Sequence, residues 1–158
     1  MAVQVAISDA ELKRTVNKMR ALRGQITKRQ FKNALRKGAN IIRDEAKANV
    51  PIADEGYTLY KDGKPFASAL PGFVRDAIEV KSLRRSDSLF VGVVKKDGLL
   101  PYWAQWLEFG ARNRDGSTRP GFGFMRKAVA AKKEEAIAAI VKAGEALISK
   151  TVKRISNQ

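Results

Sequence analysis

The chain has 158 residues, which is enough for one domain, with 44% apolar residues to build a core and a formal net charge of +15. It contains neither Cys nor His, which excludes disulfides, thiolate metal sites and the commonest general base. No apolar run approaches the ~18 residues of a membrane span, and the N-terminus lacks the order of a signal peptide, so we expect a cytosolic or virion protein.

The N-terminal part predicts a short strand and two helices. Residues 3–7 alternate like a strand, and Ser8 with Glu11 fits a capping box before a helix that Gly24 ends. A longer helix is predicted from about Thr27 to Asn49. Its apolar face holds Phe31, Leu35, Ala39, Ile42, Ala46 and Val50, and its basic face holds Lys28, Arg29, Lys32, Arg36, Lys37, Arg43 and Lys47.

The middle of the chain predicts a loop followed by strands. Residues 51–73 contain three Pro and three Gly and are predicted to be irregular, with a candidate small hairpin around Asp62-Gly63. Apolar side chains in this loop could pack on a neighbouring subunit, so we expect residues 52–71 to become ordered there. Residues 74–82 and 88–95 predict two antiparallel strands.

Residues 101–128 hold both Trp and three of the seven Phe. Pro101 suits a first helical position, and an aromatic residue recurs at i, i+4 and i+7 before Gly110, a natural stop. These residues predict a short helix, a loop and then a terminal helix from about Phe124 to Lys150 or beyond. The pattern predicts one α+β domain over residues 1–158, with a small antiparallel sheet of three or four strands packed against the long basic helix and the terminal helix.

The aromatic segment predicts a structural junction. We expect Trp106, Glu108, Phe109 and Phe124 to be buried between the short helix and the terminal helix, with Trp103 in the core or at a subunit interface rather than stacked on nucleobases. A buried carboxylate needs partners, and Arg119 and Arg126 are the nearest candidates for an ion pair or helix cap. The full set of structural or interface candidates is Tyr102, Trp103, Trp106, Glu108, Phe109, Gly110, Arg119, Phe122, Phe124 and Arg126.

No set of residues predicts catalysis. Glu79-Val80-Lys81 on a predicted strand is one element of a metal-dependent nuclease site, but the same spacing recurs at 45–47 and 62–64, so an exposed charge pair is the favoured interpretation. The acidic pairs at 44–45, 54–55 and 134–135 are expected to be solvated. The sequence therefore predicts no catalytic residue, no cofactor and no metal.

The order of several short motifs resembles that of a phage family. Leu107-Glu108-Phe109-Gly110 precedes Gly123-Phe124-Met125-Arg126-Lys127-Ala128, and upstream stand Ala46-Lys47, Pro51 and the segment from Gly72 to Ile78. Over about residues 28–140 the chain is similar to the HK97-type head–tail joining or tail-completion family of tailed bacteriophages. It departs from that pattern where Gly123 and Lys127 replace frequent Pro residues and where residues 51–71 form a longer connection.

The resemblance implies a structural virion protein that completes the tail or joins it to the head. Such a protein would assemble as a homomeric ring, a hexamer or a dodecamer, at the head–tail junction or tail end, with neighbouring neck or tail proteins as partners and no membrane. It would be located in the virion, and in the host cytoplasm during assembly.

The basic charge leaves a second interpretation open. Residues 1–50 hold 12 Lys and Arg against 4 Asp and Glu, and residues 124–158 hold 8 against 3. Six basic residues of the long helix, Lys28, Arg29, Lys32, Arg36, Lys37 and Arg43, could face genomic DNA in the ring channel. The alternative function is a basic DNA-binding module, although a solvated helix surface would give the same charge pattern.

Overall fold

The computed structural model describes residues 10–157 except 62–63, 85 and 114, and gives the backbone alone for residues 57, 60, 61, 66 and 67. The predicted strand at 3–7 and the cap at Ser8 lie outside the described residues. The helices are α1 (Ala10–Ala21), α2 (Lys28–Asn49), α3 (Phe73–Asp76), α4 (Ala104–Phe109) and α5 (Phe124–Ser156). The strands are β1 (Tyr57–Lys61), β2 (Lys64–Ala69), β3 (Ile78–Ser82), β4 (Leu89–Val93), β5 (Gly110–Arg112) and β6 (Thr118–Pro120).

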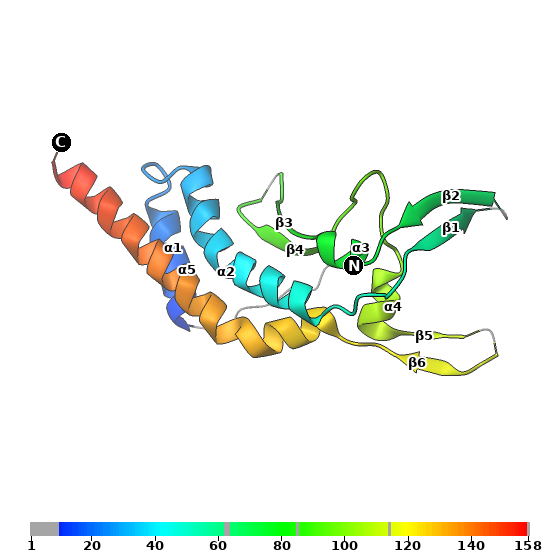
Figure 1. The fold of residues 1–158 in the computed structure, drawn as a ribbon. Coiled ribbons are helices and arrows are strands. Elements are labelled where there is room, and N and C mark those ends of the chain that lie inside the picture. The colour runs from blue at the N-terminus through cyan, green and yellow to red at the C-terminus, as the bar shows by residue number, and fades with distance from the viewer. Residues whose placement is uncertain (1–9, 62–63, 85, 114, 158) are drawn as a thin grey trace.

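The two long helices, α2 and α5, lie side by side and form the body of the molecule, with α1 packed on α5 (Figure 1). Small residues allow these close approaches. A Cβ at Gly38 on α2 would lie 2.7 Å from the side chain of Ile140, and one at Gly144 on α5 would lie 2.6 Å from Thr15 of α1. A capping box of Thr27 and Gln30 begins α2, and it was not predicted from the sequence.

The strands form three separate antiparallel hairpins, β1–β2, β3–β4 and β5–β6. The α+β class is confirmed, as is the antiparallel pairing of β3 with β4, in which Val80 lies opposite Val91. The single sheet of three or four strands is wrong, because no hairpin edge pairs with another hairpin among the described residues. Each hairpin instead packs its own face on helices or projects from them.

Two boundaries differ from the sequence prediction. Residues 73–76 form a helical turn, α3, where a strand was predicted from residue 74, because Gly72 adopts a left-handed conformation with φ 78° and the chain turns tightly there. Much of the predicted irregular loop 51–73 is the antiparallel hairpin β1–β2, which confirms the small hairpin predicted around Asp62-Gly63. Among the described residues of the loop, 51–56 and 70–72 lack regular structure.

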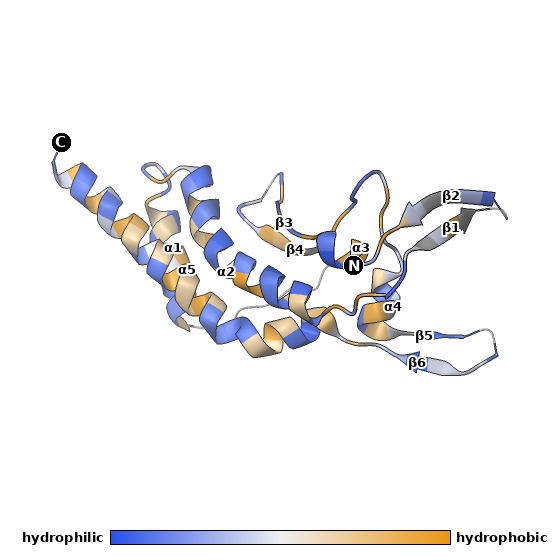
Figure 2. Cartoon of the chain, in the orientation of Figure 1, coloured by the Kyte–Doolittle hydropathy of each residue, from blue (hydrophilic) through white to orange (hydrophobic). Residues whose placement is uncertain are grey.

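The main core joins the end of α2, the α3–β3 segment, α4 and the start of α5. Its most deeply buried side chains include Ala46, Ile78, Phe124 and Ala128. Further apolar clusters line the α1–α2–α5 interface. Hydrophobic residues of α4 gather at the end of the molecule opposite the C-terminus, from which β1–β2 and β5–β6 project (Figures 1 and 2).

Candidate interaction surface

Glu108 holds the short helix α4 to the first turn of α5. It is 4% exposed, and its carboxylate accepts hydrogen bonds from the backbone N–H of Met125 at 2.8 Å and of Arg126 at 3.2 Å. The N-cap residue of α5 is Gly123, which has no side chain to cap the helix. Glu108 therefore caps α5 from a distance and places its negative charge at the positive end of the helix dipole.

Arg126 completes this junction. Its Nε donates to a Glu108 carboxylate oxygen at 3.0 Å and its guanidinium also donates to the Glu108 carbonyl at 2.8 Å. The same guanidinium lies 5.3 Å from the centre of the Phe109 ring. The predicted ion pair and helix cap of Glu108 are therefore present with Arg126, whereas Arg119, the other candidate, lies exposed on β6.

The connection between α4 and α5 closes through backbone contacts that require glycine. Phe122 N–H donates to the Leu107 carbonyl at 2.7 Å, and Gly123 N–H donates to the Glu108 carbonyl at 3.2 Å. A Cβ at Gly121 would lie 2.5 Å from the Glu108 carbonyl oxygen and the Gly110 nitrogen. Gly110, with φ 90°, ends α4 as predicted. The helix begins at Ala104, however, and not at Pro101 as the sequence had indicated, so Tyr102 precedes it. The need for glycine at position 121 was not predicted from the sequence. A Gly directly after Pro120 could have indicated a close approach of the backbone there.

Trp106 and Phe109 are half exposed rather than buried in the junction, contrary to prediction. Trp106 is 48% exposed and Phe109 is 49% exposed, while Phe124 is buried as expected. Because each helical residue turns by about 100°, fixing Glu108 inward directs Trp106 and Phe109 outward. The buried residues of α4 are instead Ala104 and Glu108.

Several partly exposed aromatic rings lie on α4 and the segments that flank it. Tyr102 contacts Trp106 edge-to-face with centroids 5.5 Å apart, and contacts Trp103 at 5.2 Å. Trp103 is half-buried and also lies 6.1 Å from Phe73, next to the main core. Phe122 is about half exposed. We call the four half-exposed residues Tyr102, Trp106, Phe109 and Phe122 the aromatic cluster.

A groove of about 730 Å³ runs between α4 and the hairpin β5–β6. This volume is within the range of protein pockets that hold ligands, ~300–1,000 Å³. Its lining combines aromatic and basic side chains without an acidic one: Trp103, Trp106, Leu107, Gly110, Ala111, Arg112, Asn113, Arg119, Pro120 and Phe122. Arg112 had not been predicted as part of this surface, because its place in the groove lining depends on the β5–β6 hairpin, in which it lies opposite Thr118.

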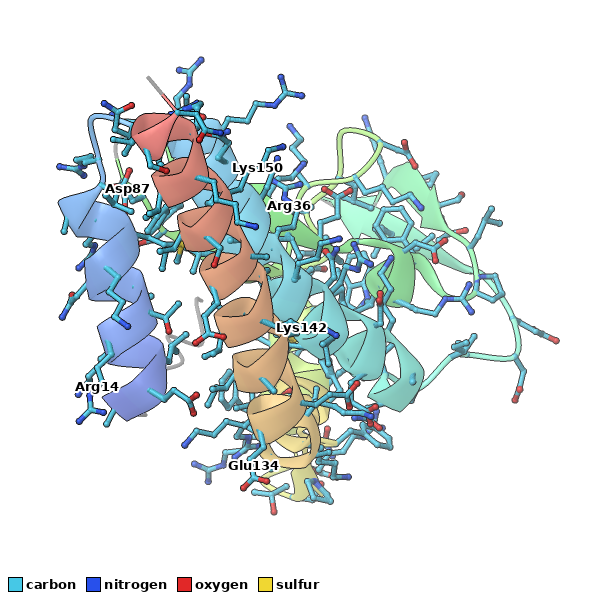
Figure 3. All side chains as sticks on the ribbon, turned by 90° about the vertical axis from the view of Figure 1, so that its left-hand side faces the viewer. Arg14, Arg36, Asp87, Glu134, Lys142 and Lys150 are labelled. Atoms are coloured by element: carbon cyan, nitrogen blue, oxygen red, sulfur yellow. The ribbon has the colours of Figure 1, made fainter. Side chains whose placement is uncertain are left out.

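The basic face of α2 is partly engaged within the molecule. Lys32 donates to the Leu83 carbonyl at 2.9 Å, and Arg36 donates to the Ser82 hydroxyl at 3.2 Å, so both hold the end of the β3–β4 hairpin. Figure 3 labels Arg36 on α2. Arg43 donates to the carboxylate of the adjacent Asp44 at 2.7 Å. Among the six predicted DNA-channel residues, Lys28, Arg29 and Lys37 lie exposed on the helix.

The candidate nuclease residues form a surface ion pair. The Glu79 carboxylate lies 2.7 Å from the Lys81 ammonium, and this hydrogen bond holds the pKa of Glu79 below its usual value. Gly92 lies opposite Glu79 on the neighbouring strand, so no second carboxylate faces it. Within the described ranges, no group of three or more acidic side chains could hold a metal ion.

In the same part of the chain, no helix is long and apolar enough to cross a membrane.

The comparisons with known proteins identify a phage family. A family model described as "Bacteriophage HK97-gp10, putative tail-component" matches residues 10–110, from the start of α1 to the end of α4. The match includes the Leu107–Gly110 motif and ends before Gly123–Ala128. No curated protein and no solved structure matches the chain. Since the match covers well over half of the sequence, the chain belongs to the HK97-gp10-like family of bacteriophage tail components.

Proposed function

We propose that this protein is a structural virion subunit that forms a homomeric ring at the head–tail junction or tail end of a tailed phage or prophage. In this role it completes the tail or joins it to the head, and it contacts neighbouring neck or tail proteins. Its subunits assemble through complementary surfaces, without a chemical reaction. Family membership supports the tail role, and the surface at α4 supports the assembly step.

The observation that carries this proposal is the aromatic cluster. Its four rings are each about half exposed at one end of the molecule. If each ring still offers roughly 100 Å² of apolar area, complete burial of all four would contribute on the order of 10 kcal/mol before the costs of association. Association itself costs an estimated ~4–15 kcal/mol, so this cluster could offset much of that cost in a subunit contact.

Two hairpins favour contacts between several copies. β1–β2 and β5–β6 project beyond the helices at the end that carries α4 (Figure 1). Projecting hairpins offer surfaces that can contact a neighbouring copy. A surface patch at one end that meets a different patch on the next copy generates a ring if the rotation closes.

The chemistry of the described side chains also favours an assembly role over catalysis. The sequence offers no His or Cys as base or nucleophile, and its Glu79–Lys81 pair is exposed on the hairpin surface. The buried Glu108 carboxylate accepts a hydrogen bond from the first turn of α5 and does not face an open cleft. The polar side chains of the α4–α5 junction therefore stabilise the fold, which favours a structural role.

A basic DNA-binding module remains the second candidate, favoured by the net charge of +15. Exposed Arg29 and Lys37 on α2 could face a channel that carries DNA. A salt series separates the candidates, because affinity based on phosphate contacts falls steeply as salt rises, whereas a ring held by apolar contacts persists.

Native mass spectrometry of the purified protein, combined with negative-stain images, tests the ring. We expect a closed oligomer, a hexamer or a dodecamer, that persists in moderate salt. A monomer of 17.5 kDa at every concentration and salt would contradict ring formation by this protein alone. The matched variant Trp106→Ala should lower oligomer stability, whereas Ala138→Ser on exposed α5 should leave it unchanged.

A further inference from the structure

The groove between α4 and β5–β6 has a positive character that its neighbours do not neutralise. Arg112 and Arg119 line it, and within the described part of the chain neither guanidinium makes a hydrogen bond or ion pair. Among the residues that the structure describes, no Asp or Glu lines it. A segment that fits this groove must therefore supply carboxylates for the arginines and an apolar side chain for Trp106 and Phe122.

The chain itself contains such a segment between α2 and β1. Ile52, Ala53, Asp54 and Glu55 are all exposed, and Ile52 keeps 50% of its surface accessible. Asp54 and Glu55 form no hydrogen bond or ion pair within the described residues. Several other carboxylates are engaged: Asp44 with Arg43, Asp76 with Lys96, Asp87 with Arg23, and Glu135 with Lys132. Within the described residues Asp97, Glu134 and Glu145 also lack such a partner, but none of them is followed or preceded by a second unpaired carboxylate. We call residues 52–55 the acidic segment.

The overall charge strengthens the case for this contact between copies. Two subunits of net charge +15 repel each other, and at 0.1 M salt this repulsion acts over about 10 Å. Opposite local charges at the contact would reduce this repulsion, while burial of apolar side chains supplies the part of the stability that persists in salt. The acidic segment is a free pair of adjacent carboxylates next to an exposed apolar side chain, and the groove offers two free arginines next to exposed aromatic rings.

We propose that the acidic segment of one copy docks into the groove of a second copy. Asp54 and Glu55 pair with Arg112 and Arg119, and Ile52 packs against the exposed aromatic side chains. Arginine suits this role because its planar guanidinium can bind a carboxylate through two hydrogen bonds. This inference rests on the proposed function, since it specifies the contact through which the copies assemble.

Charge reversal tests the pairing. One variant carries Arg112→Glu and Arg119→Glu, and a second carries Asp54→Lys and Glu55→Lys. Each variant alone places like charges in the contact and should lose the oligomer, leaving the 17.5 kDa monomer in native mass spectrometry. Mixed in equal amounts, the two should assemble again, because both mixed contacts are complementary. The chain with all four reversals should assemble by itself.

Two controls match the number of reversed charges. Lys142→Glu with Lys150→Glu, and Glu134→Lys with Glu145→Lys, change exposed residues of α5 and should leave the oligomer intact (Figure 3 labels Lys142, Lys150 and Glu134). Circular dichroism should show that every variant keeps the wild-type helix content. The reversed residues are exposed, so a folding defect is not expected.

The outcomes separate this inference from the proposed function. If wild type never forms an oligomer, the proposed ring is wrong. If wild type assembles and the reversed variants assemble equally well, or if mixing them fails to restore the oligomer, only this contact is wrong. Loss of assembly on reversal of the arginines, with none on reversal of the acidic segment, would overturn it in favour of an acidic segment from a different protein.

Discussion

Replacement of Glu108 by Ala should destabilise the fold more than any other single carboxylate change in the described chain. Glu108 is buried and accepts hydrogen bonds from two backbone donors at the start of α5 and from the Arg126 side chain. Its removal leaves the N–H of buried Met125 without a partner and takes the cap from a helix whose N-cap residue is glycine.

The magnitude follows from these two effects. An unpaired buried donor costs about 1–3 kcal/mol and a lost N-cap about 0.5–2 kcal/mol, and the two overlap because they share the Met125 bond. The ion pair with Arg126 adds little, since the Arg126 side chain is 59% exposed. We therefore expect a loss of about 2–4 kcal/mol in the free energy of unfolding, or roughly 4–16 °C in Tm for a chain of this size.

Urea denaturation of the monomeric protein, followed by circular dichroism, measures this loss. Glu108→Gln should show a smaller loss, because its amide oxygen can still accept from Met125. Glu134→Ala on the exposed face of α5 should change stability by less than about 0.5 kcal/mol. The cap argument is refuted if Glu108→Ala unfolds at the wild-type urea concentration.

Three further predictions concern the same end of the molecule. Gly121→Ala should cost about 1–3 kcal/mol of stability because its Cβ meets backbone atoms of Glu108 and Gly110, whereas Gly24→Ala, with open space around it, should be neutral or slightly stabilising in the same urea assay. Phe109→Ala should stay folded with a Tm close to wild type, since the ring is half exposed, and should weaken the oligomer in native mass spectrometry; insoluble protein would restore the buried role first predicted from the sequence. Limited proteolysis should cut residues 52–71 in the monomer and spare them in assembled particles, and equal cleavage in both would count against docking of this region.

The sequence predicted the long helices and the β3–β4 pairing because each depends on local pattern. In α2, the apolar period and Pro51 gave bounds within a residue or two of Lys28–Asn49. The terminal helix followed from the buried positions Ile137, Ile140 and Gly144, which recur at helical spacing.

The arrangement of the hairpins could not be predicted in this way. Whether two hairpins share a sheet depends on tertiary packing, which local alternation does not encode. The predicted orientation of α4 was wrong for a related reason. Its aromatic period was read as a buried face, but the requirement for a cap on α5 directs Glu108 inward and leaves Trp106 and Phe109 at the surface. The sequence identified the right residues of this segment and misassigned which of them are buried.

The groove depends on still longer-range structure. Arg112 and Arg119 both line the groove although they are not a directly opposed pair, since β5 and β6 pair Ala111 with Arg119 and Arg112 with Thr118. No spacing rule in the linear sequence indicates that two arginines seven residues apart line one surface with Trp106. Their common role became visible only once the hairpin was placed beside α4.

Electron microscopy of phage particles that carry a gold-labelled copy of this protein tests the central claim most directly. The account predicts label at a single position in each particle, at the head–tail junction or the tail end. Label spread along the tail tube, or particles that complete their tails and contain no label, would contradict it.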